Sequence, residues 1–252
     1  MSLKRPVISL FLLILFILVY GQIVDPLLGL LDLQTENAKY LAIKGVMATL
    51  LCAYVALRGL GRDVGLVARV NWRTLPLYWP MLLILVLIWF GVEEVAAPAV
   101  LSQILLMTLF VGIGEELMFR GLIFHWFRQL SPVKLVLLSS AAFGGVHLSG
   151  LMTDIPSAVI LAQSYFAFAL GLIFGCARVR DYSILLPIVV HWLFDFFAIG
   201  ARGGVSETFD GSTQIVIGLL FSGTIALLWG LYLVYKLRND GKLESTWSVA
   251  KV

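Results

Sequence analysis

The sequence predicts an all-α membrane protein, a polytopic bundle of about eight transmembrane helices. Two observations lead to this fold class. The 252 residues are 60% hydrophobic and only 13% charged, whereas a soluble domain is about 45–50% apolar and about 25% charged. The apolar residues are also gathered in runs close to about 20 residues, the length that a helix needs to cross a bilayer. These runs are too long and too uniform for the alternating strands of a barrel.

Eight apolar runs are the candidate transmembrane helices. The first follows Lys4 and Arg5 and resembles a signal peptide. It is long for a signal peptide, and no small-residue cleavage site follows it, so we expect an uncleaved span. In chain order the runs cover residues 7–24, 40–57, 75–92, 98–124, 133–148, 155–177, 183–200 and 215–235.

Basic and acidic residues alternate along the connections between these runs. Cytoplasmic loops carry an excess of lysine and arginine. One set of ends and connections is basic and holds Lys4, Arg5, Arg58, Arg62, Arg69, Arg73, Arg128, Lys134, Arg178, Arg180, Lys236, Arg238 and Lys242. The opposite set has mainly Lys39 and Arg202 as positive residues, with Asp25, Asp32, Glu36, Glu93, Glu94, Asp154, Glu207 and Asp210. The alternation predicts a multi-pass integral membrane protein with both termini in the cytoplasm.

The chain is expected to form one membrane domain in three parts. These are N-terminal helices over residues 1–97, a core over 98–200 and a last helix with a cytoplasmic tail over 201–252. The net charge of +3 is small and its positive residues are scattered, which gives no indication of nucleic-acid binding. Cys52 and Cys176 lie inside apolar runs, where small buried side chains are expected rather than a disulfide or a thiolate metal site. The oligomeric state is not indicated.

Strongly polar side chains inside the spans are the candidate functional residues. A charge at the centre of a transmembrane helix costs about 2.5–3.5 kcal/mol, and such residues mark functional sites by default. Three charged residues lie in the stretch "GEELMFRG" of the fourth span, and three further polar residues lie in the fifth and seventh spans. The six residues are Glu115, Glu116, Arg120, His147, His191 and Asp195.

Helical spacing separates the two adjacent glutamates. Glu116 and Arg120 are four residues apart, so they share a face and can form an ion pair. Glu115 points about 100° away from Glu116. It has no partner within its own helix, which leaves it available as a general base.

The two histidines come from other spans. His191 and Asp195 are four residues apart on one face, and His147 follows Gly144 and Gly145, which predict a close approach by another helix. Simple counting from the span ends puts Glu115 and His147 about 15 Å apart in depth. They can meet only if the fourth helix continues to about residue 127 and the fifth begins deeper or tilts.

Three motifs now carry a resemblance to a known family. "EELMFR" fits E-E-x-x-x-R, "FGGVH" fits F-x-x-x-H and "HWLFD" fits H-x-x-x-[N/D]. In this order and on separate hydrophobic spans, they resemble the CAAX protease and bacteriocin-processing family (CPBP, also called Abi) of intramembrane endopeptidases. The resemblance covers residues 98–200 and identifies this part as the catalytic core.

The resemblance implies roles for all six residues. Glu115 would activate water with the help of His147, while Glu116 and Arg120 would hold the site together. His191 and residue 195 would stabilise the oxyanion. The related prenyl-protein proteases usually carry Asn where this chain has Asp195, and an ionised carboxylate cannot donate a hydrogen bond. Asp195 could instead orient His191.

Several functions fit these residues. The expected one is cleavage of a membrane-associated or lipidated (CAAX-like) peptide, or of a bacteriocin or pheromone peptide, in a bacterial inner membrane or a plasma membrane. The sequence predicts no particular cofactor, although Glu115, His147 and His191 could bind zinc and leave one position open. The charge of Arg120 favours the metal-free route. A proton-coupled carrier and a binding or immunity partner without catalysis are the alternatives from other classes.

Overall fold

The computed structural model describes residues 4–28, 30, 35–90, 97–205 and 212–240. These residues form helices and no strand, so the predicted all-α fold class is confirmed. Seven of the described helices are long and apolar enough to cross a membrane, and the helix Leu185–Gly200 is apolar but shorter. Each of the eight predicted spans therefore corresponds to a helix.

The long helices follow one another along the chain, and short 3-10 or π-helical segments adjoin some of them. Three spans are composite: a 3-10 turn leads into α3, α4 continues through a π-helical segment into α5, and α6 continues into a 3-10 turn. In order they are α1 (Lys4–Leu28), α2 (Glu36–Leu57), η2 (Trp72–Tyr78), α3 (Trp79–Trp89), α4 (Pro98–Glu116), η3 (Leu117–Leu122), α5 (Ile123–Trp126), α6 (Pro132–His147), η4 (Leu148–Met152), α7 (Ser157–Asp181), α8 (Leu185–Gly200) and α10 (Thr213–Arg238).

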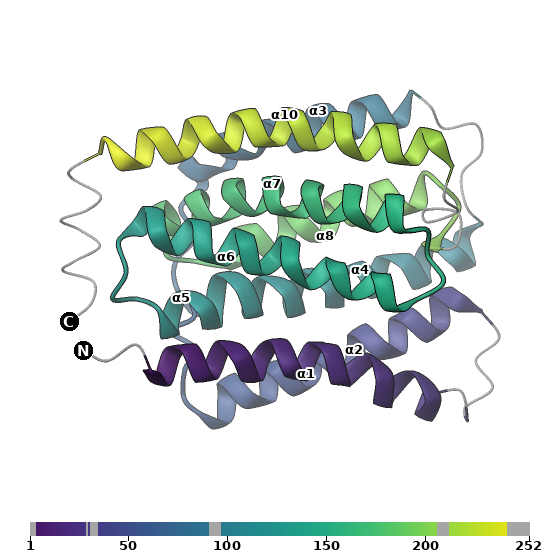
Figure 1. The fold of residues 1–252 in the computed structure, drawn as a ribbon, viewed down its shortest axis with the longest axis horizontal. Helices are drawn as coiled ribbons and strands as arrows, with labels where there is room; N and C mark the ends of the chain where they lie inside the picture. Colours follow the sequence, from purple (N-terminus) through teal and green to yellow (C-terminus); the bar gives the residue numbers. More distant parts are fainter. Residues whose placement is uncertain (1–3, 29, 31–34, 91–96, 206–211, 241–252) are drawn as a thin grey trace.

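Helix α7 lies at the centre of the bundle. It packs between α6 and α10, while α4 packs against α2 and α8 (Figure 1). Most of α7 is buried, as expected of a helix that is apolar all round. The core helices are therefore α4, α6, α7 and α8. The candidate residues lie on α4 with its continuation η3, on α6 and on α8.

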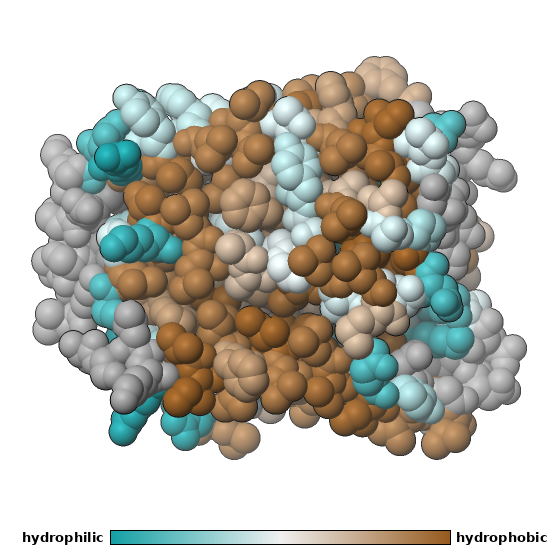
Figure 2. Space-filling view, in the orientation of Figure 1, coloured by the Kyte–Doolittle hydropathy of each residue, from teal (hydrophilic) through white to brown (hydrophobic). Residues whose placement is uncertain are grey.

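Hydrophobic side chains cover the middle of one face of the molecule. Figure 2 shows them over the centre of one face, with hydrophilic side chains gathered at its two ends. The helices run between these ends, and the start of α1 and the end of α10 lie at the same end (Figure 1). This band of apolar surface along the helix axes is the pattern of a protein that spans a bilayer.

Some loop charges used in the topology prediction fall outside the described residues. They are Asp32, Glu93, Glu94, Glu207, Asp210 and Lys242, and the side chain of Asp25 is not described either. The last turns of α7 and α10 carry Arg178 with Arg180 and Lys236 with Arg238. The first turn of α2, at the opposite end, carries Glu36, which pairs with Lys39.

The fourth span extends as far as the depth argument required. Residues Pro98–Trp126 form one continuous span, and α6 begins only six residues later at Pro132. Glu115 and His147 line one cavity, so the depth difference from simple counting does not separate them.

Candidate active site

The polar cluster begins where α4 becomes the π-helical segment η3. Glu115 and Glu116 end α4, and Arg120 lies in η3. Short π-helical turns are rare and frequently occur at functional sites. The expected ion pair is present, because Arg120 Nη1 lies 3.0 Å from Glu116 Oε1 and both side chains are fully buried.

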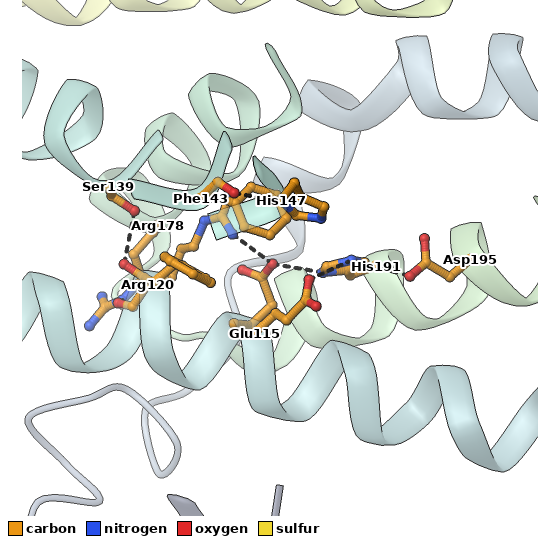
Figure 3. A network of polar contacts seen from close by, with 10 residues as sticks. Glu115, Arg120, Ser139, Phe143, His147, Arg178, His191 and Asp195 are labelled. Atoms are coloured by element: carbon orange, nitrogen blue, oxygen red, sulfur yellow. Dashed lines mark hydrogen bonds and ion pairs between the residues drawn. The ribbon is translucent and has the colours of Figure 1, made fainter. Parts of the chain in front are cut away.

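Two donors from neighbouring helices hold the π-helical segment. Ser139 of α6 donates to the carbonyl of Phe119 over 2.9 Å, and Arg178 of α7 donates through Nε to the carbonyl of Arg120 over 3.1 Å (Figure 3). The wider turn of a π-helix breaks the regular pattern of backbone hydrogen bonds. The two carbonyls thus find partners on α6 and α7, which fix η3 against the core.

Glu116 also binds His191. His191 Nδ1 lies 2.9 Å from Glu116 Oε1, the same oxygen that contacts Arg120. An ionised carboxylate only accepts hydrogen bonds, so Nδ1 carries the proton and donates it. The other ring nitrogen, Nε2, lies 3.4 Å from Asp195 Oδ2 and 3.8 Å from Glu115 Oε2. The shorter contact that orients His191 therefore comes from Glu116.

His147 is the last residue of α6 and has a similar arrangement. Its Nδ1 lies 2.7 Å from the carbonyl oxygen of Phe143, which can only accept, so Nδ1 donates. In the neutral imidazole this leaves Nε2 without a proton and able to accept. His147 lines the same cavity as Glu115 and His191 (Figure 3).

Two phenylalanines enclose the charged cluster. The Arg120 guanidinium carbon lies 4.4 Å from the Phe143 ring centre and 5.0 Å from the Phe174 ring centre. The same two rings contact His191, at centroid distances of 6.0 Å and 5.5 Å. Cations are attracted to aromatic faces, so the rings help to position the Arg120 guanidinium, and they also pack against the His191 ring. Phe143 belongs to the F-x-x-x-H motif, whereas Phe174 gave no signal because it lies within an apolar run.

The glycines before His147 behave differently from each other. A Cβ atom at Gly144 would lie 2.9 Å from both Phe168 Cβ and the Ser164 carbonyl oxygen of α7. Ser164 also donates to the Gly144 carbonyl over 2.8 Å. The predicted close approach is therefore present at Gly144. At Gly145 the prediction is wrong, because a Cβ there would meet nothing within 4 Å.

A cavity of about 390 Å³ opens over these residues. Its walls include Glu115, His147, His191 and Asp195, which the structure thus brings together, while Glu116 and Arg120 lie buried behind the wall. Small-molecule and cofactor pockets are usually about 300–1,000 Å³. The cavity can therefore hold a short segment of peptide next to a carboxylate and two imidazoles.

Lys44 is a site residue that the sequence analysis missed. It comes from α2, lines the cavity, and its Nζ lies 3.5 Å from Glu115 Oε1. Glu115 has no partner on its own helix, as expected, but it has this partner on another. The signal was present in the sequence, since Lys44 is a charge inside the apolar run 40–57.

The sequence suggested Glu115, His147 and His191 as possible zinc ligands. No group of three or more His, Cys, Asp or Glu side chains in the described part of the chain is arranged to hold one. A cation beside Glu115 would also have to share its carboxylate with the Lys44 ammonium.

Comparison with known proteins gives a match to one family model. Residues 97–197 match the sequence model described as type II CAAX prenyl endopeptidase Rce1-like. The matched segment begins next to α4 and ends within α8, so it contains all six residues identified from the motifs but not Lys44. No curated protein and no solved structure matches the chain. This match agrees with the CPBP family predicted from the three motifs, and it confirms that resemblance for residues 97–197.

Proposed function

We propose that this protein is an intramembrane endopeptidase that cleaves a membrane-associated or lipidated, CAAX-like peptide with a water molecule activated by Glu115. The family match supports a CAAX-type protease in general terms. The observation that carries the specific proposal is the cavity, in which Glu115 lies beside two histidines within a bundle of membrane-spanning helices.

Glu115 is the general base in this proposal. Its carboxylate takes one proton from water as the water oxygen bonds to the scissile carbonyl carbon. The carbonyl π electrons move to oxygen and form an oxyanion. When the C–N bond breaks, Glu115 returns the proton to the leaving nitrogen, so the products are a carboxylic acid and an amine.

The two histidines assist from different sides of Glu115. His147 Nε2 can accept a hydrogen bond from the water, because its Nδ1 is held by the Phe143 carbonyl. His191 Nε2 faces Glu115 Oε2 at 3.8 Å. Their fixed ring orientations supply the positioning that a water-activating site needs.

Cleavage of a defined peptide tests the proposal. An internally quenched CAAX peptide, with and without a farnesyl group, is incubated with purified protein in detergent. Wild-type protein should cleave it, while Glu115→Gln should lose at least about 100-fold in rate and His147→Ala a comparable amount. Glu36→Gln is the control, because Glu36 is exposed and paired with Lys39 at the end of α2. Full cleavage by Glu115→Gln would overturn the mechanism. Proton-driven uptake into liposomes without any cleavage would favour a carrier.

The proposed reaction needs no metal. Cleavage should persist at the wild-type rate after exhaustive dialysis against EDTA and 1,10-phenanthroline. Loss of activity, restored by added zinc, would instead favour Glu115, His147 and His191 as metal ligands. Elemental analysis of the dialysed protein completes the test.

We also propose that the end of the bundle that carries Arg178, Arg180, Lys236 and Arg238 faces the cytoplasm, with both termini on that side of a bacterial inner membrane or a plasma membrane. Its support is the excess of basic residues there. A green fluorescent protein fused after Arg238 should fluoresce, and alkaline phosphatase at the same point should be inactive. The reverse result would place the termini outside.

A further inference from the structure

Lys44 is the charged group of the cavity that the family-matched segment does not contain. It lies on α2, its side chain is 26% exposed, and Nζ faces Glu115 Oε1 at 3.5 Å. We propose that Lys44 is a catalytic residue whose ammonium stabilises the oxyanion formed when water adds to the peptide carbonyl. This inference rests on the proposed endopeptidase function.

The site needs a donor for the oxyanion. Oxyanion stabilisation requires N–H or O–H groups that already point at the position of the developing charge. Asp195, when ionised, can only accept. His147 and His191 each use the Nδ1 proton elsewhere, for the Phe143 carbonyl and for Glu116. In their neutral forms, neither imidazole has a second proton to donate. When His191 is protonated, its Nε2 proton faces the carboxylates of Asp195 at 3.4 Å and Glu115 at 3.8 Å.

Lys44 meets this need by its chemistry and its place. An ammonium has three donors and no acceptor. Among the described residues that line the cavity, Lys44 is the only lysine or arginine. Neutral donors such as Gln163 line it too, but Lys44 is the donor that contacts Glu115. Arg120 is fully buried and already bound to Glu116.

The position of Lys44 also matches the movement of charge during the reaction. Before attack, its ammonium faces the negative charge of Glu115. As Glu115 takes the proton from water, that charge disappears from the carboxylate and a negative charge appears on the carbonyl oxygen. The ammonium can follow it over a short distance with little reorganisation, which is the condition under which electrostatic stabilisation is effective.

A different role for Lys44 would be to bind the C-terminal carboxylate of the peptide. Kinetics separate the two roles. Loss of an interaction made only in the transition state lowers kcat and leaves KM nearly unchanged, whereas loss of ground-state binding raises KM. A raised KM that comes from lost carboxylate binding should disappear when the peptide carries a C-terminal amide, whereas a lowered kcat should remain.

The experiment compares Lys44→Met, Lys44→Gln and Lys44→Arg with wild type on the quenched farnesylated CAAX peptide, as free acid and as amide. Lys39→Met is the control, because Lys39 is on the same helix but pairs with exposed Glu36. We expect Lys44→Met and Lys44→Gln to lower kcat about 100- to 1,000-fold on both peptides. KM should stay within about threefold, and Lys44→Arg should recover part of kcat because it keeps the charge.

Each other outcome decides against the proposal. Unchanged kcat in Lys44→Met, while wild type cleaves, overturns the role of Lys44 alone. A raised KM only on the free-acid peptide shows that Lys44 binds the carboxylate. A large fall of the melting temperature in both Lys44→Met and Lys44→Gln would show that Lys44 is only a structural partner of Glu115. If wild-type protein cleaves neither peptide, the endopeptidase proposal fails and this one fails with it.

Discussion

His191 Nδ1 lies 2.9 Å from Glu116 Oε1, and this hydrogen bond joins α8 to the end of α4 inside the bundle. The same oxygen accepts from Arg120 at 3.0 Å. Glu116 therefore fixes the direction in which His191 presents Nε2 to the cavity. The two adjacent glutamates have different surroundings: Glu115 faces the cavity and Glu116 lies behind it.

Glu116→Gln should destabilise the protein strongly. The change leaves Arg120 as a buried cation without its charged partner, and breaking a buried pair in this way costs about 3–5 kcal/mol. The measurement is thermal unfolding in detergent. A thiol-specific dye detects unfolding through its reaction with Cys176, which is buried in the folded state. The double variant Glu116→Gln with Arg120→Met should be less harmful than the sum of the two single changes. Additive effects would contradict the coupling.

Asp195→Asn should be much milder than Glu116→Gln. The Asp195 side chain is 25% exposed and lies 3.4 Å from His191 Nε2, so solvent screens its charge and His191 keeps its bond to Glu116. We expect a loss of less than about 1 kcal/mol, the usual range for an exposed ion pair. The same unfolding measurement checks this. Cleavage should also fall less than in Glu116→Gln, and the opposite order would show that Asp195 is the residue that orients His191.

The sequence was sufficient for the fold class and pointed to six candidate residues, although it did not lead to Lys44. Long apolar runs predict helices that cross a membrane, and a spacing of four predicts the pair formed by Glu116 and Arg120. Both follow from local geometry, which depends only on positions along one helix. The ionisable side chains in these runs are conspicuous because lipid makes each of them costly.

Contacts between helices could not be predicted in the same way. The bond from His191 to Glu116 depends on which face α8 presents to α4, and spacing within α8 points only to Asp195. Phe174 is one apolar residue among many, and its role follows from its contacts with Arg120 and His191. The π-helical turn at η3 depends on partners from α6 and α7. Each of these features belongs to the packing of the bundle.

Phe174→Leu should impair cleavage more than it impairs folding. Leucine keeps an apolar side chain in the buried site but is smaller than phenylalanine, and the small cavity that it leaves should cost about 1–2 kcal/mol. It removes the aromatic face beside the Arg120 guanidinium and the His191 ring. Phe197→Leu is the matched control on α8, because Phe197 is 46% exposed. Peptide cleavage and melting temperature are measured for both, and equal loss of cleavage would contradict the positioning role.

Gly144→Ala and Gly145→Ala form a pair of identical changes at adjacent positions of α6. The new methyl group at Gly144 would lie 2.9 Å from the Ser164 carbonyl oxygen, which is backbone and cannot move without shifting α7. Such overpacking costs about 1–3 kcal/mol. At Gly145 the methyl group meets nothing within 4 Å, and alanine is better than glycine within a helix by about 0.5–1 kcal/mol.

The melting temperature in detergent should therefore fall for Gly144→Ala and stay unchanged or rise for Gly145→Ala. Neither glycine has a positive φ, so backbone strain does not enter the comparison. Cleavage should decrease only in Gly144→Ala, because His147 follows three residues later on the same helix and a shift between α6 and α7 moves its ring away from Glu115. Equal losses of stability in the two variants would show that α6 and α7 are not in close contact at Gly144.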